Sequence, residues 1–284
     1  MSIKTETSEA MPEAVWSGGV LEAEGRDAGA FLQAQLMNDV SQLGVGDWQW
    51  NGWLSPKGRV IALTLLLRRG EQLYWLVLPD YPATRLADDL RRFQFRSKLS
   101  LRARDDLFLQ PGEDQTGAET GHGALARIRL GGHPSRVLDI SAVPPATGDR
   151  DSIASWRLAD LAHGLPRLPE SAVALHTPQM LGLDRLHAFS VKKGCYPGQE
   201  IVARTHFLGQ AKRGLRRLVG NEPIAPGSGV LDAGHRIGDI LCSASVGDRH
   251  EALAVLPLDL QATRLAGEQG QALTLTDFAH GMHR

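Results

Sequence analysis

The sequence predicts an α+β fold that ends in a small β-barrel, and three observations lead to this prediction. In the longer, N-terminal part, a strand–helix–strand–strand–strand–helix unit can be traced. A shorter unit of similar kind follows it, which indicates an internal duplication. From Lys212 onward the chain changes to short strands with Gly-Asp and Pro-Gly turns and no helical period, as in small barrels. The 284 residues are enough for two or three packed units.

The first predicted unit opens with a strand at Val15 to Glu24, followed by a helix that Asp27 is expected to cap and that runs to about Val40. The segment Ser55-Pro56-Lys57-Gly58 has Pro at its second position and Gly at its fourth, which is typical of a tight turn. The other expected elements are strands at 47–54, 59–67, 72–78 and 99–104, and a helix opened by Asp80 and Pro82 that turns Leu86, Leu90 and Phe93 inward.

The second unit is shorter and begins after an expected exposed loop at 111–123, which has no periodicity. Strands are expected at about 124–130 and 135–140, and a Pro-rich linker leads into a helix at about 151–163. We place a domain boundary near residue 210. The chain is thus divided into a disordered lead-in (1–14), an α+β region of two related subdomains (15–210) and a C-terminal barrel (211–284).

Composition excludes several classes of protein. Apolar residues make up 42% of the chain and charged residues 22%, as in ordinary globular proteins. The net charge of −1 means that any contact with nucleic acid must come from a local patch. Two cysteines form no disulfide framework, residues 1–14 resemble no secretory signal, and the longest apolar run, Val60 to Leu67, is far short of a membrane helix. We therefore expect a cytoplasmic protein that does not contact a membrane.

The chemistry of the chain is concentrated between Arg185 and Arg217, where eight Lys or Arg accompany one acid, Glu200. Such a stretch is either a solvated basic surface or a surface that faces an anion. Cys195 follows two lysines and precedes a Tyr-Pro-Gly turn, and a helix is expected to begin at Pro197 or Gly198. Positive charge and a helix start favour the thiolate. The alternative is a cysteine that packs as a small apolar residue.

No metal site is expected. An iron–sulfur cluster usually takes four thiolates, and the sequence contains no C-x-x-C or H-E-x-x-H motif. The second cysteine, Cys242, lies in a strand pattern and is expected to belong to the barrel core.

A long motif identifies a family resemblance. Lys193-Gly194-Cys195-Tyr196, one further residue and then Gly198-Gln199-Glu200 resembles the signature of the YgfZ-type folate-binding proteins, which belong to the aminomethyltransferase-like superfamily. The resemblance covers roughly residues 16–217. Further segments that fit the same pattern are Phe31-Leu32-Gln33, Gln35-Leu36, Asn38-Asp39-Val40, Pro56-Lys57-Gly58-Arg59, Pro178-Gln179, Leu183-Asp184, Ile201-Val202-Ala203-Arg204, Gly209 and Lys212-Arg213.

The resemblance implies three subdomains in a cloverleaf, the last a small barrel, with tetrahydrofolate bound in a central cleft. It implies a role in the assembly or repair of iron–sulfur enzymes, including those that thiolate tRNA. The expected partners are folate and iron–sulfur enzymes or their assembly factors, and any effect on tRNA would be indirect. Cys195 and Lys193 would be the functional pair, a thiol and the lysine that activates it.

Four residues are candidates for contact with folate. In similar proteins a Trp before a Gly-x-Pro turn contacts folate, and Trp156 precedes Gly164-Leu165-Pro166. A flat ring system gains from an aromatic face in an apolar pocket, although a core Trp would fit the same pattern. Trp16 is expected to play a matching role on the first strand. Arg204 is a candidate for binding the carboxylates of folate, and Glu200 is a candidate carboxylate in the site.

Two other functions remain open. Aminomethyltransferases resemble this chain, but they carry an aspartate on the strand where this sequence reads Ala62-Leu63. This difference argues against one-carbon transfer by their mechanism, although Asp39 and Glu200 are possible substitutes. A protein that binds tRNA through the basic stretch is the third possibility, and it predicts salt-sensitive affinity for RNA.

Overall fold

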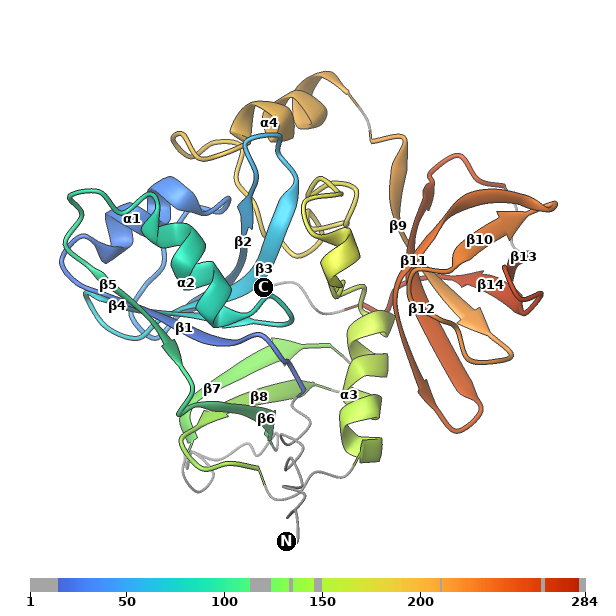
Figure 1. Cartoon of the computed structure of the whole chain (residues 1–284), viewed down its shortest axis with the longest axis horizontal. Helices are drawn as coiled ribbons and strands as arrows, with labels where there is room; N and C mark the ends of the chain where they lie inside the picture. Colours follow the sequence, from blue (N-terminus) through green and yellow to red (C-terminus); the bar gives the residue numbers. More distant parts are fainter. Residues whose placement is uncertain are drawn as a thin grey trace, which may run out of the picture.

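The computed structural model describes residues 15–112, 124–132, 135–145, 150–209, 211–261 and 264–280. The predicted lead-in at 1–14 and almost all of the predicted loop at 111–123 lie outside these ranges. Figure 1 shows a sheet with two helices, a smaller sheet beside a long helix, and a barrel at the C-terminal side. The α+β class and the closing barrel are therefore confirmed. Within the described ranges, no helix is both long and apolar enough to span a bilayer.

The first sheet is antiparallel, with strand order β2-β3-β4-β1-β5. Its strands are β1 (Gly19–Glu24), β2 (Trp48–Leu54), β3 (Val60–Arg68), β4 (Leu73–Leu78) and β5 (Ser100–Arg104). β2 and β3 form a hairpin around the predicted turn at 55–58, with Trp53 opposite Ala62. β1 starts later than predicted, because the chain bends at 15–18 and buries Val15 and Trp16 against the sheet.

Two helices cover one face of this sheet, α1 (Ala28–Gln35) and α2 (Ala83–Arg91). α1 ends before the predicted Val40, because Leu36 is already extended. Asp27 occupies the N-cap position, but its carboxylate accepts a hydrogen bond from the backbone N–H of Lys98 instead of capping the helix. Phe93 lies beyond α2 and is 39% exposed, so the prediction that it points inward is wrong.

The second part consists of a three-stranded sheet, order β6-β8-β7, and the helix α3 (Arg150–Ala162). Its strands are β6 (Phe108–Gly112), β7 (Ala124–Gly131) and β8 (Arg136–Ser141). β6 was not predicted, because its last residues, Pro111 and Gly112, are residues that usually break strands. Pro111 stays compatible with the sheet because β6 is an edge strand.

The C-terminal part is a closed barrel in the order β10-β11-β12-β9-β14-β13. Its strands are β9 (Arg213–Gly220), β10 (Gly229–Asp232), β11 (His235–Val246), β12 (Arg249–Pro257), β13 (Arg264–Gly267) and β14 (Ala272–Thr276). Between α3 and the barrel run a short helix, η1 (Glu170–Ala172), long loops, and α4 (Gln199–Leu208). α4 begins directly after Gly198, which confirms the predicted helix start.

The two faces of the first sheet belong to different cores. Leu21, Trp53 and Leu76 face α1 and α2. Val20, Trp50 and Val77 face the opposite way, into a larger core shared with β7, β8, α3 and the barrel strands. This division decides where the candidate residues lie, because each side chain of the sheet can reach only one of the two faces.

Candidate functional site

The loop that carries Cys195, here called the cysteine loop (Ser190–Gly198), is held against the first part of the chain. The N–H of Ser190 donates to Met37 O over 2.9 Å. Gly198 has a φ of +78°, and a Cβ at this position would lie 2.6 Å from Gly58 Cα. Only glycine allows this backbone-to-backbone contact. It explains why the turn at 55–58 and the end of the cysteine loop, which are far apart in the sequence, form one structure.

Lys193 anchors the cysteine loop to the end of α1. It is 6% exposed, and its Nζ donates to Gln33 O (2.6 Å), Leu36 O (2.7 Å) and Asn38 O (2.8 Å). These carbonyls lie where the helix ends and lack partners within the helix. Burial lowers the pKa of Lys193 to about 8, and the carboxylate of Asp39 opposes the shift, so the group is mainly protonated at neutral pH.

This geometry gives Lys193 a role that differs from the one expected from sequence. Its ammonium group is engaged with backbone carbonyls, and no contact with the sulfur of Cys195 is found among the described residues. The structure thus supports a role in positioning the cysteine loop. Activation of the thiol by Lys193 stays a prediction.

Replacing Lys193 by methionine keeps the apolar stem but removes the charged donor to the three carbonyls. Leaving buried acceptors unpaired should lower the free energy of unfolding by about 2–3 kcal/mol. Amide exchange in the cysteine loop should quicken. Lys192→Met is the matched control, because Lys192 is the exposed neighbour, and its effect should stay within about 0.5 kcal/mol. Equal unfolding curves for the two variants would contradict the anchoring role.

Cys195 itself is exposed and lies at a cavity of about 500 Å³. Apolar side chains form one wall of this cavity, among them Trp53, Ile61 and Phe93. The other wall is the cysteine loop together with Gln199 and Glu200 of α4. An exposed thiol beside an apolar hollow is accessible to a partner molecule. Cys195 is therefore not the packed cysteine of the alternative interpretation.

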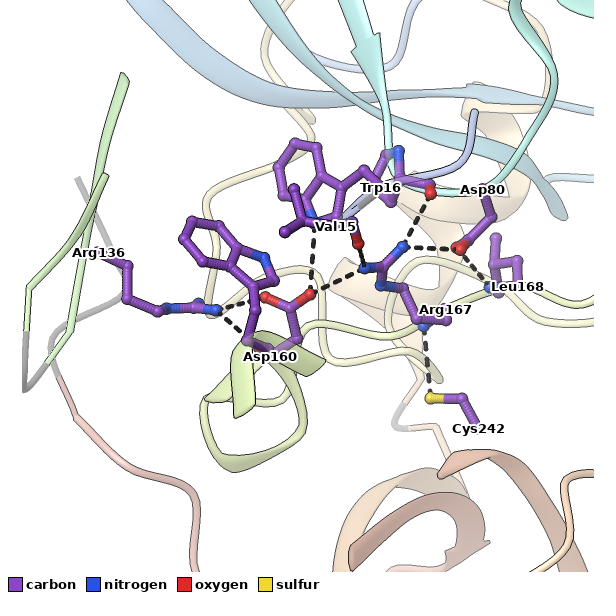
Figure 2. Close-up of polar contacts among 10 residues, drawn as sticks. Val15, Trp16, Asp80, Arg136, Asp160, Arg167, Leu168 and Cys242 are labelled. Atoms are coloured by element: carbon purple, nitrogen blue, oxygen red, sulfur yellow. Dashed lines mark hydrogen bonds and ion pairs between the residues drawn. The ribbon is translucent and has the colours of Figure 1, made fainter. Parts of the chain in front are cut away.

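The two candidate tryptophans lie elsewhere, in a buried network of charged residues around Asp160, which Figure 2 shows beside Trp16. Trp16 is 1% exposed and its Nε1–H donates to Asp160 Oδ2 over 3.3 Å. Trp156 is 7% exposed, and the guanidinium group of Arg136 lies 5.0 Å from the centre of its ring. Asp160 also accepts hydrogen bonds from Arg136 (2.6 Å) and from Arg167 (3.1 Å).

Arg167 extends this network to all three parts of the chain. Its guanidinium group donates to Val15 O and Pro79 O and pairs with Asp80 at 2.9 Å. Its backbone N–H donates to the sulfur of Cys242 on β11 over 3.5 Å. Cys242 is buried, but in the core shared by the three parts, so the prediction that it belongs to the barrel core is wrong. Burial raises the pKa of Cys242 to about 12. The network connects the residues before β1, the loop after β4, α3 and the barrel.

The four candidate folate residues do not form one pocket. Trp16 and Trp156 belong to the core on one face of the first sheet, whereas Glu200 lines the cavity of Cys195, whose Trp53 belongs to the other face. Arg204 is exposed on α4. The expected basic surface is dispersed as well. Arg185 donates to the carbonyls of His163 and Gly164, and Arg217 pairs with Glu251.

Sequence reasoning missed a cavity of about 450 Å³ where the three parts meet, here called the junction cavity. Its volume lies in the range of small-molecule sites. It combines apolar and charged side chains from the three parts, namely Val15, Ser17, Asp80, Tyr81, Pro82, Arg157, Arg167, Leu168, Pro169, Glu170, Val173, Pro226, Leu241, Cys242 and Ser243. No sequence signal marks these residues as a group, because they come from segments without a shared motif. In the described ranges, no cluster of three or more His, Cys, Asp or Glu is placed to hold a metal ion.

Comparison with known proteins places these features in context. No family model matches the chain. The tRNA-modifying protein YgfZ of Vibrio vulnificus strain YJ016 is 30% identical over 283 residues, which cover 89% of this chain and 87% of the relative. The protein of the same name from Aliivibrio fischeri strain MJ11 is 27% identical over 83% of this chain and 81% of its own length.

One solved structure has the same fold. The glycine cleavage system aminomethyltransferase T from Bartonella henselae aligns with a TM-score of 0.68. The alignment covers 91% of this chain and 82% of that protein, with 20% sequence identity. The aminomethyltransferase-like fold expected from the sequence is therefore confirmed.

Proposed function

Because this chain belongs to the family of the tRNA-modifying protein YgfZ, we propose that it binds tetrahydrofolate and supports the assembly or repair of iron–sulfur enzymes that modify tRNA. The family name supports the link to tRNA modification. The aminomethyltransferase-like fold supports folate as the ligand, since the sequence resemblance implies a folate site in the central cleft.

The junction cavity is the observation that carries the folate proposal. It lies where the three parts meet, as a central cleft would, and it offers a ring, Tyr81, and the guanidinium group of Arg157. The guanidinium group of Arg167 is already held by Asp80 and Asp160, and the lining also contains the carboxylates of Asp80 and Glu170. Folate has a flat bicycle at one end and carboxylates at the other, so a mixed lining of this kind suits it. In this proposal Trp16 does not line the cavity but supports Arg167, which does. The guanidinium carbon of Arg167 lies 5.9 Å from the centre of the Trp16 ring. Trp156 supports Arg136 in the same network.

Calorimetry tests this assignment. Tetrahydrofolate should bind the unmodified chain, and Val173→Trp should abolish the binding because the larger side chain fills the junction cavity from its partly buried wall. Val143→Trp makes the same change at a position that is 57% exposed and outside the cavity, so its binding should be unchanged. Unchanged binding by a folded Val173→Trp variant would move folate out of this cavity. No binding by the unmodified chain would refute the proposal.

The exposed thiol is the second component of the proposed function. Cys195 lies outside the junction cavity, so we assign it to the contact with a client enzyme or its cluster instead of to folate. A thiolate can ligate or attack where a serine hydroxyl cannot. The lysine-anchored loop holds the thiol at the surface, where a macromolecule can reach it.

The alternative function, one-carbon transfer, lacks a carboxylate on β3. Ala62 and Leu63 are both buried and apolar, and neither can move a proton or stabilise a cation. We expect no methylenetetrahydrofolate above background when the chain is incubated with aminomethylated carrier protein and tetrahydrofolate. Robust turnover in this assay would make the chain a transferase.

A further inference from the structure

A second cavity adjoins the junction cavity and has an excess of positive charge. Its volume is about 570 Å³, and it lies between the start of β3, the segment 169–180 and the barrel. We call it the arginine cavity. Its charged and titratable lining residues are Arg59, His176, Arg213, Arg236 and Asp239. Arg236 pairs with Asp239 and with Glu268 beside the cavity, whereas no ion pair of Arg59 or Arg213 is found among the described residues. Arg59 and Arg213 belong to two motif segments, and neither side chain has a role in the site described above.

Both inner arginines keep free donors. Arg59 uses Nη1 for Leu175 O (3.2 Å) and for the sulfur of Met180 (3.5 Å). Arg213 uses Nη2 for Ile237 O and Val255 O. The remaining nitrogens of these two side chains have no hydrogen-bond partner among the described residues. These contacts therefore fix the direction of each guanidinium group, while its other N–H groups remain available to donate hydrogen bonds to a ligand.

The pKa of His176 is affected by the same positive charge. Its Nδ1 is buried and has no partner within the part of the chain that the structure describes. Burial lowers the pKa of His176, and Arg59 and Arg213 lower it further, whereas Asp239 opposes the shift. The ring is therefore neutral at neutral pH. An anion in the cavity would relieve the repulsion between these groups and would raise the pKa of the ring.

We infer that the arginine cavity binds the carboxylates of the glutamate tail of folate, an inference that rests on the proposed function. The two cavities share Pro169 and Leu241 as lining residues, so they lie next to each other, and the inference places one ligand across both. The glutamates of the tail are joined through their γ-carboxyl groups, so each adds more than the roughly 3.4 Å of an ordinary extended residue, and a tail of a few glutamates would reach across. Each added glutamate brings a carboxylate, and guanidinium groups bind carboxylates in a two-pronged geometry.

Calorimetry on the unmodified chain with two ligands tests the inference. The triglutamate of tetrahydrofolate should bind about tenfold or more tightly than the monoglutamate, because it adds charge-assisted hydrogen bonds. The difference should shrink as salt is added. Arg59→Gln and Arg213→Gln should reduce the triglutamate affinity toward that of the monoglutamate and leave the monoglutamate affinity unchanged. Arg264→Gln, an exposed position on β13, is the charge-matched control and should keep the full difference.

The possible outcomes distinguish a failure of the inference from a failure of the proposed function. If both ligands bind the unmodified chain equally well, the inference is overturned while folate binding stands. If neither binds, the proposed function fails and the inference fails with it. The comparison of two ligands needs no variant, so equal affinities overturn the inference even if the loss of Arg59 or Arg213 unfolds the chain. A triglutamate preference that survives in folded Arg59→Gln and Arg213→Gln would also overturn it.

Discussion

Asp160→Ala is expected to lower the free energy of unfolding by about 3–5 kcal/mol, the usual cost of removing one partner of a buried ion pair. Asp160 is 1% exposed and accepts hydrogen bonds from Arg136, Arg167 and Trp16. Without it, two buried guanidinium groups lose a counter-charge at the point where the three parts of the chain meet. Since single domains are stable by only about 5–15 kcal/mol, this loss is a large share of the total stability.

Asp88→Ala is the matched control for this measurement. Asp88 also pairs with an arginine, Arg91, but its side chain is 71% exposed. Exposed pairs contribute little, so the unfolding curve should shift by about 0.5 kcal/mol or less. Urea denaturation of the two variants gives both values. Similar small losses for both would mean that Asp160 does not hold the junction together.

Cys195→Ser is expected to abolish support of the dependent iron–sulfur enzymes while the fold and folate affinity stay nearly unchanged. The substitution hardly changes the volume, and the exposed position tolerates a hydroxyl group. A serine cannot supply a thiolate at neutral pH, so any step that needs one stops. The measurement is the level of thiolated tRNA under oxidative stress, in a strain that lacks the protein and is complemented with the variant.

Cys242→Ser provides the internal comparison, because it removes the other thiol of the chain. Cys242 is 7% exposed, and burial raises its pKa to about 12, so it is not expected to react. Its variant should restore thiolation nearly as well as the unmodified protein. Full rescue by soluble, folded Cys195→Ser would leave the exposed thiol without a function.

The fold could be predicted to the extent that it depends on local patterns. The alternation along β2 and the tight turn at 55–58 place the first hairpin, and the turn-rich texture after Lys212 predicts a barrel. The errors lie at element ends. The prediction carried α1 to Val40, because the apolar period continues through Leu36, yet that residue leaves the helix to pair with Trp53. Such a contact between distant segments leaves no trace in a local pattern.

The candidate site could be predicted only in part. The motif around Cys195 locates an exposed thiol, and the resemblance singles out Lys193. The local sequence cannot show that Lys193 faces the end of α1, because the carbonyls that it binds belong to residues 33–38, far away in the chain. The same reason hides the junction cavity. Val15, Tyr81 and Ser243 become neighbours only when three parts of the chain pack together.

Trp16 and Trp156 show where aromatic residues mislead sequence reasoning. Both suit the face of a flat ligand, but both are buried beside charged side chains, Trp16 at Asp160 and Trp156 at Arg136. A buried ring and a ring that lines a site have the same local pattern. The charged residues around them distinguish the two cases, and these come from β8, α3 and the loop at Arg167.

If the proposed function is right, folate binding in the junction cavity is needed for the support of tRNA-modifying enzymes. The most direct test is the level of thiolated tRNA in a strain that lacks the protein and carries Val173→Trp in its place. This variant should be folded but unable to bind tetrahydrofolate, because Val173 lies in the wall of the cavity. We predict that thiolation falls to the level of the uncomplemented strain, while Val143→Trp restores it. Full restoration by a folded Val173→Trp protein that binds no folate would contradict the claim.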